Sequence, residues 1–134
     1  MPDVRIGVLS CSGEECLGGT VARLATRKVM EELREGTTVS LCLPLYVAGG
    51  GEERNFAKEH SVISVDGCSK SCARKATERF SGDVSDTIVI SDILGEDVAL
   101  GKTVSARDLT EEHYIMVDKV AEEICKKVDK IAAE

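Results

Sequence analysis

Six cysteines are the side chains best suited to chemistry in this sequence of 134 residues. Thiolates bind thiophilic metal ions and attack disulfides, whereas a buried thiol often serves only as a small apolar group. The closest pairs in sequence are Cys68-x₃-Cys72 and Cys11-x₄-Cys16, and no Cys-x-x-Cys pair occurs. The chemistry therefore depends on which cysteines the fold brings together.

Strand-like and helix-like segments alternate along the chain, which is typical of βαβ units and a parallel sheet. Apolar and β-branched runs predict strands at 3–11, 37–43, 61–65 and 87–90, and helical periodicity covers 21–33, 52–59, 69–80 and 110–133. Residues 47–51 are expected to form a flexible loop. The sequence thus predicts a single domain over 1–134: a three-layer Rossmann-like or flavodoxin-like α/β sandwich with about four mainly parallel strands and helices on both faces.

Four cysteines fall where this topology would gather them. Cys11 ends the first strand, Cys42 lies near the end of the second, Cys68 follows the third, and Cys72 lies in the first turn of the next helix. The carboxyl ends of parallel strands share one edge of a sheet, where ligands bind in open α/β proteins. Cys68 and Cys72, one helical turn apart, could bind the same ion. We therefore expect a zinc site held by these four cysteines, with an iron–sulfur cluster as the alternative.

The remaining cysteines and both histidines are weaker candidates. Cys16 could replace Cys42 as a ligand, since it lies in the glycine-rich loop after Cys11. Cys42, in an apolar strand, and Cys125, beside core positions of the final helix, could each be a small buried apolar residue. We interpret His60 as a surface residue and His113, near a helix start, as structural.

Asp66 precedes Gly67 and Cys68, and two roles for it are equally open. Its carboxylate could support the metal ligands, as could the hydroxyl groups of Ser10, Ser12 and Ser69, or Asp66 could simply turn the chain.

The order Cys11-Ser12-Gly13, then Cys42, then Val65-Asp66-Gly67-Cys68-x₃-Cys72 resembles the DGC domain family, named after its central Asp-Gly-Cys motif. The resemblance covers roughly residues 4–80, and the rest of the chain is compatible with it. It implies a small zinc-binding protein with four chelating cysteines, which correspond to Cys11, Cys42, Cys68 and Cys72. It implies no reaction, and Cys16 is extra to the family pattern.

Three function classes follow from these residues. The leading hypothesis is a metal-binding protein. The second is a thiol–disulfide or sulfur-transfer protein that uses Cys68 and Cys72, or Cys11 and Cys16. The third, a small-molecule or phosphate binder, rests on glycine-rich loops alone, because neither G-x-G-x-x-G nor G-x-x-x-x-G-K-[ST] occurs.

The composition limits which binding partners and which cellular locations we expect. The net charge is −7 and aromatic residues make up 3% of the chain, so it would repel a phosphate backbone and offers few surfaces for base stacking. We expect no nucleic-acid partner. No 18-residue apolar run and no basic-then-apolar leader are found, so we expect neither a membrane span nor export, but a cytoplasmic, reducing location. The final helix could cover its own sheet or form a homodimer interface.

Overall fold

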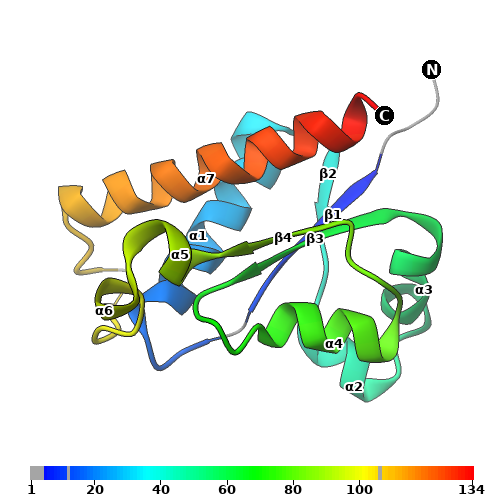
Figure 1. Cartoon of the computed structure of the whole chain (residues 1–134), viewed down its shortest axis with the longest axis horizontal. Coiled ribbons are helices and arrows are strands. Elements are labelled where there is room, and N and C mark those ends of the chain that lie inside the picture. Colours follow the sequence, from blue (N-terminus) through cyan, green and yellow to red (C-terminus); the bar gives the residue numbers. More distant parts are fainter. Residues whose placement is uncertain (1–4, 12, 106) are drawn as a thin grey trace.

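Four parallel strands form the centre of the molecule in the order β2-β1-β3-β4 (Figure 1). The computed structural model describes residues 5–11, 13–105 and 107–134. The strands are β1 (Ile6–Ser10), β2 (Thr38–Ser40), β3 (Ser61–Asp66) and β4 (Asp86–Val89). Helices cover both faces, so the predicted three-layer α/β sandwich is confirmed. This strand order is that of flavodoxin-like folds rather than the Rossmann order.

One face of the sheet is covered by α1 (Leu17–Lys28), which continues into the π-helical turn η1 (Val29–Leu33), and by α7 (Glu111–Ala132). The opposite face carries α2 (Leu43–Ala48), α3 (Gly51–Glu59) and α4 (Cys72–Phe80). The short helices α5 (Ile90–Leu94) and α6 (Glu96–Ala99) follow β4. In the part of the chain that the structure describes, none of these helices could span a membrane.

The two central strands are buried on both faces, because both layers of helices pack against them. Val8 of β1 and Ile63 and Val65 of β3 have no exposed surface. Burial of such side chains is the main stabilising contribution in a domain of this size. On the α2 face, Tyr46 is fully buried and its hydroxyl group lies 3.1 Å from that of Thr77, which joins α2 to α4.

The final helix matches the prediction closely. Thr110 caps α7 in a capping box: its side chain accepts a hydrogen bond from the His113 N–H, and its own N–H donates to His113 Nδ1 at 3.0 Å. The structural role expected of His113 is therefore confirmed. Arg34 binds both carboxylate oxygens of Asp129, which helps to fix α7 beside η1.

Several predicted boundaries were wrong. The second strand ends at Ser40, and the expected loop at 47–51 is mostly helical, because Pro44 in the first turn suits the start of α2. A left-handed Gly49 (φ 89°) ends α2 before α3 begins. Ile90 belongs to α5 rather than to the fourth strand, and the sequence reasoning missed both α5 and α6.

Candidate functional site

The carboxyl ends of β1 and β3 lie side by side, and this is the point where the chain leaves the sheet in opposite directions. From β1 it crosses to β2 on one side, and from β3 to β4 on the other. Such a switch point opens a crevice in which flavodoxin-like folds bind ligands. Cys11 directly follows β1, and its N–H continues the ladder by donating to the Val65 carbonyl oxygen at 2.9 Å. The Asp66-Gly67-Cys68 segment ends β3 in the same place.

The thiol of Cys11 is buried at this point, with 7% of the residue exposed. Its Sγ accepts a hydrogen bond from the Gly67 N–H at 3.3 Å. Burial raises the pKa of the Cys11 thiol, hydrogen bonds from the Gly67 and Gly13 backbone lower it, and the nearby charges of Asp66 and Cys72 raise it further. The net shift is upward, so the Cys11 thiol keeps its proton near neutral pH.

Asp66 of the central motif fixes the beginning of α4. Its carboxylate, 1% exposed, accepts hydrogen bonds from the Ala73 N–H at 2.7 Å and the Arg74 N–H at 3.2 Å. These N–H groups belong to the first turn of α4 and would otherwise lack partners. Burial raises the pKa of the Asp66 carboxyl, against the lowering by these bonds and by Lys75 and Arg74. Asp66 thus acts as a helix cap from the end of a strand, which sequence reasoning did not foresee.

Glycines allow the backbones around Cys11 and Cys68 to touch. A Cβ on Gly67 would lie 2.6 Å from the carbonyl carbon of Gly18, and one on Gly18 would lie 2.6 Å from the Gly67 oxygen. A Cβ on Gly19 would lie 2.3 Å from the Gly13 oxygen. The loop after β1, the start of α1 and the loop after β3 are therefore pressed together.

The same contacts argue against phosphate binding at the start of α1. The space above Gly18 is occupied by backbone oxygens of Gly67 and Ala99, and the Leu17 N–H donates to the Gly101 oxygen at 3.0 Å. A phosphate at a helix N-terminus needs free N–H groups and room to approach them. Gly18 and Gly19 therefore allow close packing of the backbone against Gly67 and Gly13.

Three of the four predicted ligands lie around the switch point. Cys68 is half-buried in the turn between β3 and α4, and Cys72 is the exposed first residue of α4. The expectation that they share a helical turn was wrong, because α4 begins only at Cys72, after Ser71 in a left-handed conformation (φ 54°).

Cys42 lies outside the sheet. It is exposed, directly precedes α2, and its N–H donates to Glu53 Oε2 at 2.8 Å. It is therefore neither a strand residue nor a buried apolar residue, and both expectations of its surroundings were wrong. Across all described residues, no three Cys, His, Asp or Glu side chains are gathered closely enough to hold a metal ion.

The two other cysteines differ from each other. Cys16, half-buried, immediately precedes α1 and pairs with Lys102 in a single antiparallel bridge. Cys125 is buried in α7, and burial raises the pKa of its thiol, so its expected place in the core is confirmed. Of the hydroxyl groups considered near the site, that of Ser12 lies outside the described residues.

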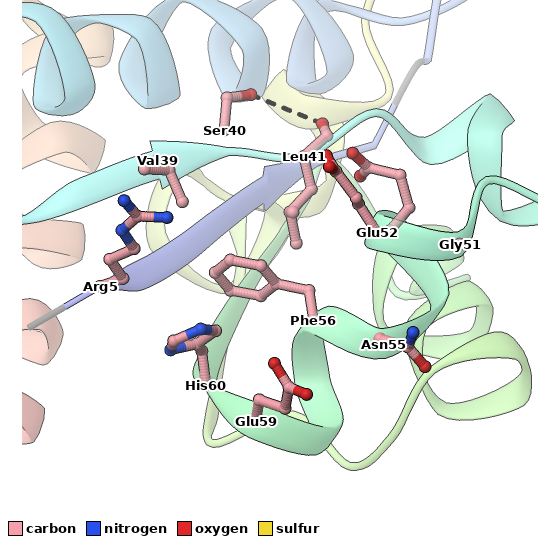
Figure 2. A pocket seen from close by; sticks show the side chains of 11 residues that line it. Arg5, Val39, Ser40, Leu41, Gly51, Glu52, Asn55, Phe56, Glu59 and His60 are labelled. Atoms are coloured by element: carbon pink, nitrogen blue, oxygen red, sulfur yellow. Dashed lines mark hydrogen bonds between the residues drawn. The ribbon is translucent and has the colours of Figure 1, made fainter.

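A separate hollow of about 560 Å³ lies beside β2 and α3, and no cysteine lines it (Figure 2). Phe56 stacks obliquely against His60, with ring centroids 4.8 Å apart. Phe56 also covers Gly7, where a Cβ would lie 2.7 Å from the ring. His60 is half-exposed at the end of α3, away from the thiols of the switch point.

Of the comparisons with known proteins, the one with family models agrees with the motif. No curated protein and no solved structure matches the sequence significantly. The DGC domain matches residues 7–120, which include nearly all of β1, the whole of β3, the Asp66-Gly67-Cys68 segment and most of the helices. Because this match covers well over half of the chain, the protein belongs to the DGC domain family.

Proposed function

We propose that Cys11, Cys68 and Cys72 form a thiol centre that captures a thiophilic metal ion, with zinc as the candidate, and that the site closes when the ion binds. The observation that carries this proposal is the hydrogen bond of 3.3 Å from the Gly67 N–H to Cys11 Sγ, which holds the Cys11 sulfur against the residue directly before Cys68. Two donors of the type that zinc prefers are thereby near each other at the place where this fold class binds ligands.

Groups near Cys11 offset part of the cost of an anionic sulfur, although burial still raises the pKa of its thiol. Cys11 Sγ already receives backbone N–H hydrogen bonds, which stabilise a thiolate, and Arg74 and Lys75 bring positive charge to the same turn. Cys68 and Cys72 are partly or fully accessible, so their side chains can change rotamer without unpacking the core. These residues fit a thiolate site of three donors, although the observed side chains are not yet gathered around an ion position.

Cys11 must lose its proton to become a ligand. Because its pKa is raised, binding would release that proton and strengthen as the pH rises. A zinc ion held by three thiolates keeps a fourth position for water, for a substrate or for a receiving protein. Cys16 or Cys42 could supply a fourth thiolate, but Cys42 would first have to leave Glu53.

A second function has support from the unequal exposure of Cys11 and Cys72. Exposed Cys72 could attack the disulfide of a partner, forming a mixed disulfide and releasing a thiolate. Buried Cys11 would then attack Cys72 Sγ, releasing the partner's second sulfur as a thiol and leaving a Cys11–Cys72 disulfide. The partner gains two electrons and this protein loses two.

Elemental analysis of protein purified without oxygen or chelator separates the two functions. Metal capture predicts about one zinc per chain, lost in Cys72→Ser and retained in Cys42→Ser, which changes another exposed thiol. Iron with acid-labile sulfide would assign a cluster instead. Protein that stays metal-free after anaerobic reconstitution, with Cys72 alkylated rapidly, would reject metal capture in favour of thiol exchange.

A further inference from the structure

A second hollow, of about 440 Å³, lies between the loop after β1, helix α1 and the segment that precedes α7. Two groups of opposite charge and three hydroxyl groups line it beside two apolar side chains: Arg23, Glu14, Thr20, Thr103, Ser105, Leu24 and Val104. No cysteine is among its lining residues, so the thiol chemistry proposed above does not account for it.

Hydrogen bonds within the protein hold the Arg23 side chain in place but occupy only some of its N–H donors. Its guanidinium group donates to the Gly13 carbonyl oxygen and, at 3.4 Å, to Thr20 Oγ1. A guanidinium group has five N–H donors, so further donors remain for a ligand in the hollow. The nearest carboxylate is Glu14, at 3.8 Å, and its side chain is 80% exposed. An ion pair so exposed is weak and easily displaced.

The hydroxyl groups add a donor at the same place. Thr20 is 5% exposed and its Oγ1 lies 3.1 Å from Thr103 Oγ1. If the Thr20 hydroxyl, which accepts from Arg23, donates to Thr103, then the Thr103 hydroxyl hydrogen is free to donate to a ligand. Leu24 and Val104 provide an apolar wall beside these polar groups, as small-molecule sites commonly have.

We propose that this hollow binds the oxyanion of a small molecule, a carboxylate or a phosphate group, on Arg23 and Thr103. Planar guanidinium groups recognise both anions through paired hydrogen bonds. The site adjoins the thiol centre, because Arg23 holds the Gly13 carbonyl group while the Gly13 backbone hydrogen-bonds to Cys11. The proposal itself does not depend on metal capture or thiol exchange.

The test is a titration of the full, reduced chain with inorganic phosphate and, separately, with succinate, at constant ionic strength. The expected result is saturable change in the backbone amide NMR signals of Gly13, Thr20 and residues 103–105, with a rise in Tm of about 2–5 °C. Response to one anion alone identifies whether phosphate or carboxylate is preferred. No saturable response to either overturns the proposal.

Variants locate the binding. Arg23→Ala should abolish the response, whereas Arg27→Ala, one turn further along α1 and paired with Glu31, should keep it. Glu14→Gln should strengthen binding, because a competing carboxylate is removed. Equal binding by wild type and Arg23→Ala would overturn the proposal.

If Arg23→Ala does not fold, Thr103→Val and Arg23→Lys serve instead, and both should weaken binding. Unchanged affinity in both would overturn the assignment. Cys72→Ser should leave anion binding intact, so failure of the thiol proposal and failure of this one are distinguishable.

Discussion

The surroundings of Cys11 and of Cys42 differ sharply, although both cysteines follow neighbouring strands of one sheet. Around Cys11, backbone packs on backbone, and the buried carboxylate of Asp66 fixes the beginning of α4. Around Cys42, the strand is short and at the edge of the sheet, and the cysteine is exposed beside the half-buried Glu53. A cysteine near the carboxyl edge of the sheet is therefore not enough to form a thiol centre. The loops that follow the strands must also be packed together there.

The largest difference between the Cys11 and Cys42 regions is expected for a substitution at Gly67. Gly67→Ala should lower the free energy of unfolding by about 3 kcal/mol or more, because the added Cβ would lie 2.6 Å from the backbone of Gly18. Gly51→Ala is the control, because a Cβ there meets nothing within 4 Å, and it should be neutral or slightly stabilising. Urea denaturation measures both. Equal effects would show that the loops are not closely pressed.

The next largest difference in stability between the two regions is expected when a side-chain hydrogen-bond acceptor is removed from each. Asp66→Ala leaves the buried Ala73 N–H and the part-buried Arg74 N–H of α4 without their acceptors and should cost about 2 kcal/mol. Glu53→Ala removes a single acceptor from the exposed Cys42 N–H and should cost about 0.5 kcal/mol. Denaturation midpoints of the two variants test this ranking. A larger loss for Glu53→Ala would contradict the contrast between the two regions.

The smallest expected effect is on the pH dependence of stability. Burial holds the pKa of Cys11 above its unfolded value, so above about pH 8.5 the unfolded chain loses a proton that the folded chain keeps. The free energy of unfolding should fall as the pH rises through this range, by about 1.4 kcal/mol per pH unit at most for this one proton.

Cys11→Ala should make that slope shallower, whereas Cys42→Ser should not change it. Some slope should remain in every variant, since burial also raises the pKa values of Tyr46 and Cys125. Denaturation of reduced, chelator-treated protein at several pH values measures the slope. A slope in Cys11→Ala equal to that of wild type would contradict the burial argument.

The sequence predicted the sheet because each central strand is a run of apolar residues, and parallel topology then placed Cys11 beside Cys68. It misplaced Cys42 because the β-branched run at 37–43 suggested a strand up to Pro44, whereas that proline begins a helix. The role of Asp66 could not be predicted, since it depends on the left-handed turn at Ser71 returning α4 to the strand end. The glycines are visible in sequence, but the backbone atoms that they admit are known only from the fold.

Helix α7 has a practical consequence for handling the protein. It begins near the carboxyl edge of the sheet and runs back, so that Lys127 reaches Asp86 at the beginning of β4, at 3.0 Å (Figure 1). The last residues therefore lie at the opposite edge from the switch point. A tag, a fluorescent label or a surface linkage attached at residue 134 should leave the thiol centre facing away from the support and open to metal ions and partners.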